Sequence, residues 1–216
     1  MSIATVTKGF SADGAGASRR TSVEYNHPNP YKFVLPAGKT VTAWVKTDSD
    51  TAACNLPAGH GYSNGTFDVY WAESGVNKRR YGVPGTISTN ALSLDGGTGD
   101  AFPASATTGV IVTKQVAWTD MLIDASRVQI LAVTCAIGAS GRASINFQQS
   151  DGTSIVQMDV TQDADAKPIV DNLYDIANGD TNPFGSTDVE KMVASNGTTT
   201  AGTLDVFCGE LNTDTD

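Results

Sequence analysis

Apolar and polar residues alternate along much of this chain, in short runs separated by glycine, proline, asparagine and aspartate. Alternation with a period of two is typical of strands that bury one face. The pattern is clearest from Val189 to Leu211, where Leu204, Val206 and Cys208 fall on one face. Asn196-Gly197, in the middle of this segment, suits a chain reversal that needs positive φ. We therefore expect a closing β-hairpin over residues 189–211.

A Pro-Ala-Gly turn separates two further expected strands, residues 31–35 and 39–47. In the second of these strands, Val41 and Val45 share one face and Trp44 lies on the other. This arrangement leaves Trp44 as a candidate for an exposed aromatic residue.

Two more groups of strands follow from the same pattern. Phe67, Val69 and Trp71 share one face of a strand that we expect to form a hairpin with residues 77–83. The three apolar segments 127–137, 142–149 and 153–160 are joined by short glycine-containing links, which predicts an antiparallel meander.

Residues 163–177 are the one segment whose pattern favours a helix. Pro168 suits the first helical turn, and Ile169, Leu173 and Ile176 follow a helical stripe. A loop with an embedded strand is the alternative.

The fold class predicted from these segments is mainly β, an antiparallel β-sandwich or jelly-roll-like fold with at most one short helix. We expect an N-terminal β domain over residues 1–108, with a flexible arm at 2–18, and a C-terminal β-sandwich domain over residues 109–216. The alternative is one elaborated sandwich with a single core.

The chain has 216 residues and a net charge of −9. Because an acidic surface repels nucleic-acid phosphate and anionic lipid, we expect no direct nucleic-acid binding and no membrane partner. The cluster Lys78, Arg79 and Arg80 is expected to form a solvated edge or to meet an acidic neighbour. The first residues lack the basic and apolar regions of a signal peptide, so we expect synthesis in the cytoplasm.

Three cysteines lie far apart in the sequence, at positions 54, 135 and 208. Each lies in or beside an apolar run, where a free thiol behaves as a small hydrophobic group. We expect buried thiols in preference to a disulfide between Cys135 and Cys208.

No motif predicts a catalytic, cofactor-binding or metal-binding residue, and the chain is expected not to be an enzyme. The two histidines, His27 and His60, are not near a patterned acid or cysteine. Asp95 and Asp100 surround three glycines, which would suit calcium, but the spacing of a calcium loop is missing and a tight Asp-Gly turn is favoured.

Three segments resemble the structural proteins of tailed bacteriophage particles, of the β-sandwich or jelly-roll type. They are SNGTTTAGTLDVFCGEL, VLPAGKTVTAWVKT and NGTFDVYW. The resemblance implies a subunit of the virion, such as a tail-tube, head-decoration or connector component, made in the host cytoplasm. Its implied partners are further copies of itself and other virion proteins. No functional residue can be carried over.

The alternative function is a carbohydrate-binding or adhesion module. In that case Trp44, Tyr70, Trp71 or Trp118 would present an exposed surface on which sugar rings stack. For the virion subunit, by contrast, we expect the arm and the acidic residues 212–216 to become ordered only on assembly.

Overall fold

The computed structural model describes residues 5–6, 23–24, 31–97, 101–119, 121–161, 169–175 and 179–211. In these ranges every regular element is a β-strand, and all of the strand pairs are antiparallel. The predicted mainly β, sandwich-like fold is confirmed. Within the same ranges no helix has the length and apolar character needed to cross a membrane.

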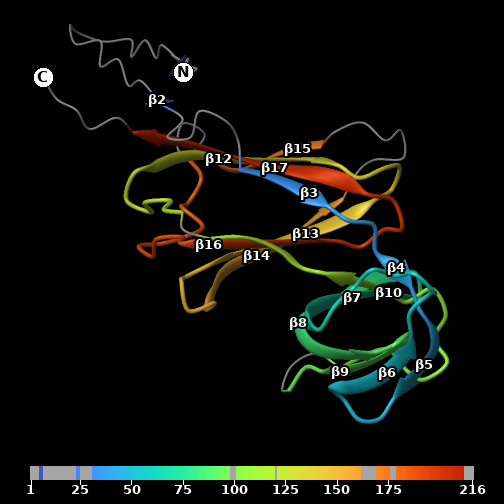
Figure 1. The fold of residues 1–216 in the computed structure, drawn as a ribbon. Helices are drawn as coiled ribbons and strands as arrows, with labels where there is room; N and C mark the ends of the chain where they lie inside the picture. The colour runs from blue at the N-terminus through green and yellow to red at the C-terminus, as the bar shows by residue number, and fades with distance from the viewer. Residues whose placement is uncertain are drawn as a thin grey trace, which may run out of the picture.

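Two facing sheets form a unit that we call the sandwich (Figure 1). The first sheet contains β1 (Thr5–Val6), β2 (Val23–Glu24), β17 (Gly202–Leu211), β12 (Val128–Ala136) and β15 (Ile169–Asp175) in this order, with β3 (Tyr31–Leu35) also paired to β17. The second sheet contains β11 (Val116–Trp118), β16 (Lys191–Asn196), β13 (Arg142–Gln148) and β14 (Ser154–Thr161).

A third sheet of seven strands forms the other unit, which we call the barrel (Figure 1). Its strand order is β4 (Lys39–Thr40), β10 (Ile111–Lys114), β7 (Gly65–Glu73), β8 (Val76–Ser88), β9 (Ala91–Asp95), β6 (Thr51–Asn55) and β5 (Thr42–Lys46). The two end strands, β4 and β5, follow one another in the chain on either side of Val41. The sheet nearly closes on itself because the chain runs directly from one end strand to the other through Val41, whose backbone N–H donates to the Val110 carbonyl at 2.9 Å beside β10.

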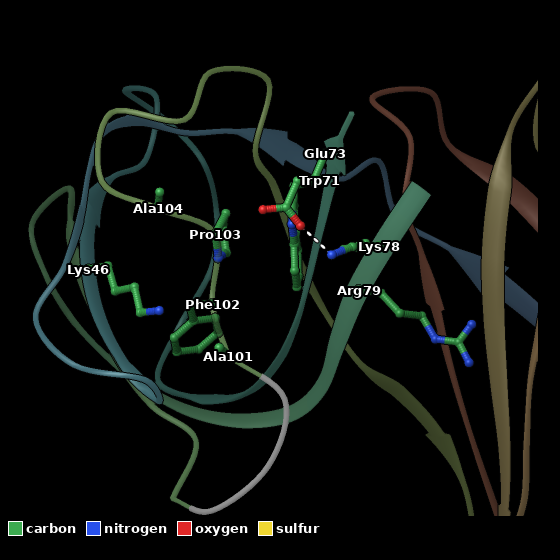
Figure 2. Close-up of a pocket in the computed structure, with 9 residues that line it drawn as sticks. All are labelled: Lys46, Trp71, Glu73, Lys78, Arg79, Ala101, Phe102, Pro103 and Ala104. Carbon is green, nitrogen blue, oxygen red and sulfur yellow. Dashed lines mark hydrogen bonds and ion pairs between the residues drawn. The ribbon is translucent and has the colours of Figure 1, made fainter. Parts of the chain in front are cut away.

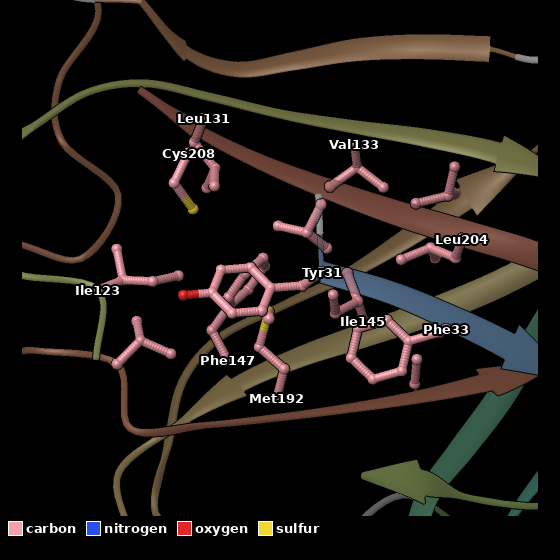
Figure 3. Close-up of a cluster of buried hydrophobic side chains, with 14 of the residues drawn as sticks. Tyr31, Phe33, Ile123, Leu131, Val133, Ile145, Phe147, Met192, Leu204 and Cys208 are labelled. Atoms are coloured by element: carbon pink, nitrogen blue, oxygen red, sulfur yellow. The ribbon is translucent and has the colours of Figure 1, made fainter. Parts of the chain in front are cut away.

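Each unit has its own apolar core. Figure 3 shows the sandwich core, in which Phe33 from β3 lies with Phe147, Met192 and Leu204 from both sheets. The barrel core contains Trp44, Phe67, Val69, Trp71, Leu92 and Phe102. Fully burying a large apolar side chain contributes roughly 1.5–3 kcal/mol relative to leaving it exposed. These two clusters therefore account for the arrangement of the strands around them.

The chain passes from one core to the other and back again. β3 belongs to the sandwich, residues 39–114 form the barrel, and β11 returns to the sandwich. The boundary expected at 108–109 lies immediately before β10, which pairs with β7 of the barrel. Of the expected arm at 2–18, only Thr5–Val6 lies among the described residues.

The expected closing hairpin over residues 189–211 is wrong in its pairing. Both strands form, but β16 lies in one sheet of the sandwich and β17 in the other (Figure 1). The link between them crosses from sheet to sheet, and the Gly197 N–H donates to the Arg142 carbonyl at 2.7 Å. Gly197 does not adopt a positive φ. A side chain there would instead collide with the Tyr70 ring, since an added Cβ would lie 2.7 Å from Cδ1.

The meander is confirmed for one of its two pairings. β13 and β14 form the expected hairpin, whereas β12 pairs with β15 and β17 in the opposite sheet. The hairpin of β7 and β8 forms as expected.

The helix expected within residues 163–177 is wrong for the described residues 169–175, which form β15. This strand pairs with β12 over six residue pairs, with a bulge between Leu131 and Ala132. Pairing with a buried neighbour outweighs the helical spacing of the apolar residues. The rest of the segment lies outside the described residues.

Trp44 is buried, with only 3% of its surface exposed, so its expected exposure is wrong. Ala43 has a φ of 50°, and the register between β5 and β6 shifts between Thr42 and Val45. This bulge interrupts the alternation of faces. As a result Trp44 points into the barrel core, and Val45 is 52% exposed.

Candidate functional site

A group of buried polar side chains lies where the barrel meets the sandwich. Asp68 and Tyr70 come from β7 of the barrel, Ser144 comes from β13, and Ser195 comes from β16. Each of the four is at most 2% exposed. We call them the junction cluster. Tyr70 belongs to neither apolar core, because it lies between the two.

Three hydroxyl groups of the junction cluster form a closed triangle. The Tyr70 Oη lies 2.8 Å from the Ser144 Oγ and 2.6 Å from the Ser195 Oγ, and the two serine oxygens are 2.9 Å apart. Both serines also donate to the Asp68 Oδ2, Ser144 at 3.4 Å and Ser195 through a shorter contact. Hydrogen bonds from both sandwich strands thus converge on one barrel strand.

The other carboxylate oxygen of Asp68 is also occupied. Its Oδ1 accepts from the Gly82 backbone N–H at 2.8 Å and from the Gln115 Nε2 at 2.7 Å. Burial raises the pKa of Asp68, while the hydrogen bonds from Ser195, Gly82 and Gln115 act in the opposite direction. A carboxylate and two serines can serve catalysis only where a substrate reaches them. Here all three are closed to solvent, so the arrangement supports a structural role.

Charged side chains surround the junction cluster. Arg79 of β8 forms an ion pair with Asp159 of β14, and the Tyr81 hydroxyl donates to the same carboxylate at 2.8 Å. From β13, the Arg142 Nη2 donates to the Lys78 carbonyl at 3.2 Å, and its guanidinium lies 5.1 Å from the centre of the Tyr70 ring. These contacts extend the polar junction to its exposed rim.

Of the two expectations for Lys78, Arg79 and Arg80, a solvated edge or an acidic neighbour, the second holds for Lys78 and Arg79. Lys78 pairs with Glu73, and Arg79 pairs with Asp159. Arg80 donates from Nη2 to the Gly96 carbonyl at 2.8 Å.

A pocket of about 640 Å³ opens on the barrel beside the β7–β8 hairpin (Figure 2). It is lined by Lys46, Trp71, Glu73, Lys78, Arg79 and residues 101–104. Figure 2 shows Lys46 on one side of the pocket and the Glu73–Lys78 pair on the other. The volume lies within the range of small-ligand sites. We call this feature the barrel pocket.

The segment that forms one wall of the barrel pocket is held firmly. Trp44 donates from Nε1 to the Pro103 carbonyl at 3.0 Å, and the Phe102 N–H donates to the Ser49 carbonyl at 2.8 Å. The Phe102 ring packs edge-on against Trp44, with the ring centres 5.5 Å apart. The wall is therefore already formed before any ligand binds.

Of the histidines and aspartates that were considered as ligands from the sequence, the described ones, His60 and Asp95, lie outside both the junction cluster and the barrel pocket. The His60 Nδ1 accepts from the Tyr62 N–H at 2.9 Å, while its Nε2 lies 3.0 Å from the Thr89 carbonyl. The Asp95 Oδ1 accepts from the Gly97 N–H at 3.2 Å, within a turn. His27 and Asp100 lie outside the described residues. In the ranges that are described, no three metal-ligating side chains gather.

The prediction of buried thiols is confirmed, since Cys54, Cys135 and Cys208 are free and buried. Burial raises the pKa of Cys54 to about 12 and that of Cys135 to about 12. The two sandwich cysteines lie on the paired strands β12 and β17, where Cys135 faces Leu204 and Cys208 faces Leu131.

The sugar-stacking surface expected for the alternative function is not formed by three of its four candidate residues. Trp44, Tyr70 and Trp71 are 3%, 1% and 5% exposed. Trp118 is half-buried and packs edge-on against Tyr31 and Phe33.

Sequence reasoning missed the junction cluster and the barrel pocket. One signal for the cluster was present, because Asp68 and Tyr70 occupy the face of β7 opposite to the apolar face of Phe67, Val69 and Trp71. A large aromatic residue on the supposedly wet face indicates that both faces are covered. The partners from β13 and β16 gave no comparable signal.

Comparisons with known proteins give little further information. No family model matches the chain, and no curated protein matches it. Among solved structures, the crystal structure of the infectious bursal disease virus VP2 subviral particle is a match at 12% identity. The match covers 88% of this chain and 73% of that chain, with a TM-score of 0.11. A TM-score this low does not establish a shared fold.

Proposed function

We propose that this chain is a non-enzymatic structural subunit of a phage particle, in a tail-tube, head-decoration or connector position. It would assemble with copies of itself or bind a symmetric shell of other virion proteins. It would act within the virion, after synthesis in the host cytoplasm. The observation that carries the proposal is the contrast between a nearly closed barrel and a sandwich with open sheet edges.

The longest open edges in the described part of the sandwich belong to β14 and β15. Each pairs with a neighbour on one side only, β14 with β13 and β15 with β12. The shorter strands β1, β3 and β11 also pair on one side only. Unpaired backbone groups on an edge strand are ready partners for a strand of another subunit. The barrel, by contrast, has little free edge because Val41 links its end strands.

The junction cluster supports the same function in a different way. A subunit that repeats in a ring or tube must present its contacts in a fixed relative orientation. The directional hydrogen bonds of Asp68 and Tyr70 to Ser144 and Ser195 fix the barrel on the sandwich. The same burial keeps these polar groups from any substrate, which supports a non-enzymatic role.

The proposal is tested by light scattering and negative-stain imaging of the purified chain over a range of concentrations. We expect rings, tubes or a defined oligomer. The double variant Ser154→Lys with Gln157→Lys places charges on exposed positions of the β14 edge, away from Asp159. Because antiparallel self-pairing would bring these lysines together, the variant should form smaller particles.

Ser93→Lys is the matched control, since Ser93 is exposed on β9 in the interior of the barrel sheet. It should leave the particle mass unchanged. A monomer at every concentration would contradict self-assembly, and a glycan array would then test the carbohydrate-binding alternative.

A further inference from the structure

The barrel pocket contains an ammonium group, that of Lys46, which forms no ion pair with a described residue. Four charged side chains line it, Lys46, Glu73, Lys78 and Arg79. Lys78 and Arg79 form ion pairs with Glu73 and Asp159, whereas Lys46 has no ion pair among the described residues. Figure 2 shows the Lys46 ammonium directed toward the middle of the pocket. The exposed Asp48 lies near enough for the Lys46 charge to help lower its pKa, but Asp48 does not line the pocket. Inside the pocket, an ammonium without an ion pair favours an anionic ligand.

A second observation independently indicates a ligand. The indole N–H of Trp71, a residue that is 5% exposed and lines the barrel pocket, has no hydrogen-bond partner in the described part of the chain. Leaving a buried donor unsatisfied is unfavourable, and Trp44 shows the usual solution by donating to Pro103. The neighbouring Glu73 side chain is 52% exposed and can shift at little cost, which would open the indole N–H to a ligand oxygen.

The burial of the aromatic rings argues for a carboxylate ligand over a neutral sugar. Phe102 and Trp71 are 3% and 5% exposed, so neither presents a face on which a sugar ring could stack. A carboxylate supplies the two things that the pocket lacks, a negative charge for Lys46 and an acceptor for the Trp71 N–H.

The sequence of this chain offers such a group after β17. Residues 212–216 read NTDTD, with carboxylates at Asp214 and Asp216. The C-terminal end of β17 lies at the end of the sandwich that is remote from the barrel (Figure 1). Five residues span at most about 18 Å, so they would reach the barrel of a neighbouring molecule more readily than their own.

We propose that the barrel pocket binds residues 212–216 of a second copy of this chain, with an aspartate carboxylate paired to Lys46. The proposal rests on the self-assembly proposed above and deepens it. A contact from the far end of one sandwich to the barrel of the next is a head-to-tail contact, which generates rings or open filaments. Each single contact is weak, and repetition around a ring strengthens it through effective concentration.

The test uses two synthetic peptides that correspond to residues 209–216. One has the natural sequence GELNTDTD, and the matched one carries Asp214→Asn and Asp216→Asn. Each is titrated into the full-length chain with the same two substitutions, so that its own acidic residues do not compete. The readout is the indole N–H resonance of Trp71, with the Trp44 indole as an internal reference because it already has a partner.

We expect the natural peptide to shift the Trp71 resonance and to bind about tenfold more tightly than the matched peptide, which keeps Glu210 but lacks both aspartates, as for a hydrogen bond to a charged group. Lys46→Gln should remove this preference. Lys32→Gln, at an exposed lysine of β3, should preserve it. Equal affinities for the two peptides, an unchanged preference in Lys46→Gln, or no Trp71 shift would overturn the proposal. Equally tight binding of free glucuronate would also overturn it, in favour of a site for small acids.

Light scattering of the natural chain, together with the peptide titration, separates this inference from the proposed function. If the natural chain assembles but does not bind the peptide at the pocket, self-assembly stands and the pocket inference fails. If the peptide binds at Trp71 but the natural chain is a monomer at every concentration, peptide binding by the pocket stands and self-assembly of the chain fails.

Discussion

Tyr70 of the barrel and Ser195 of the sandwich are joined by a hydrogen bond of 2.6 Å between buried oxygens, although they lie 125 positions apart in the chain. The two units have separate apolar cores, and Tyr70 belongs to neither. Directional polar contacts therefore help to fix the barrel relative to the sandwich, beside the packing of the buried Tyr70 ring against Gly197. Such networks are stabilising only when every member finds a partner.

Tyr70→Phe should destabilise the chain by about 1–3 kcal/mol, because it leaves the Ser144 and Ser195 hydroxyls buried with one partner fewer. The ring itself would keep its contact with Arg142. The measurement is the free energy of unfolding in urea.

Tyr81→Phe is the matched control for that substitution. It also removes one tyrosine hydroxyl at the same junction, but from a hydrogen bond to Asp159 at the exposed rim. We expect a cost below about 1 kcal/mol. Equal costs for the two variants would show that the junction cluster contributes nothing special to stability.

Asp68 should make the stability of the chain depend on pH. Its pKa is raised by burial, so the folded chain takes up a proton at Asp68 more readily than the unfolded chain. The contribution of this group to stability is therefore complete below its ordinary pKa and is lost as the pH rises through the raised value. Asp68→Asn, which has no titrating group at this position, should lack this dependence.

The measurement compares the unfolding free energies of the natural chain and Asp68→Asn between about pH 4 and pH 7. The natural chain should gain stability relative to the variant as the pH falls. Asp48 and Asp151, whose pKa values are lowered by local hydrogen bonds, affect both proteins alike and cancel in the difference. Asp159 does not cancel, because burial and the Asp68 charge raise its pKa to about 6 and the variant lacks that charge. The pKa of Asp159 is therefore lower in the variant, which acts in the same direction as the loss of Asp68. A relative gain with rising pH would contradict this prediction.

How much of the fold the sequence predicts depends on whether the decisive interaction is local. The alternation of apolar and polar residues identified the strands around Phe67 and Leu204, because this pattern depends only on the residues of each strand and not on its neighbours. It failed at Trp44, since the positive φ of Ala43 reverses the faces and alanine gives no warning of it. It also assigned β16 and β17 to one hairpin, because strand pattern does not reveal which sheet a strand joins.

The candidate sites were harder to predict for the same reason. The junction cluster combines Asp68 with Ser144 and Ser195, which come from three strands in two sheets. Small hydroxyl residues in strands usually face solvent, so neither serine stands out before the strands are placed. The barrel pocket likewise combines Lys46 with Trp71 and residues 101–104, and only the closure of the barrel brings them together.

Gly197→Ala should disturb the junction strongly. The added Cβ would lie 2.7 Å from Cδ1 of the Tyr70 ring, which is buried and held by its hydroxyl partners. Overpacking of this kind costs about 1–3 kcal/mol. Thr199→Ala, at an exposed position of the same link, should cost less than about 0.5 kcal/mol. Urea unfolding measures both, and similar values would rule out a tight contact at Tyr70.

The cysteines allow the coupling between the two units to be measured directly. Cys54 lies in the barrel core and Cys135 in the sandwich core, and burial raises the pKa of each to about 12. Neither thiol should react with a thiol reagent in the native chain, because the reactive thiolate is both rare and inaccessible. With the junction intact, both should become reactive over the same range of urea concentration, since the units unfold together.

Ser195→Ala should separate these two transitions, because it removes the sandwich hydroxyl that makes the shorter contacts to both Asp68 and Tyr70. Pulsed labelling followed by mass spectrometry assigns each reacted site by its peptide. Ser126→Ala, at an exposed serine of the sandwich remote from the barrel contacts, is the control and should leave the transitions coincident. Separate transitions already present in the natural chain would mean that the junction does not couple the units. Coincident transitions in Ser195→Ala would mean that the remaining contacts, including the Arg79–Asp159 ion pair, are sufficient for coupling.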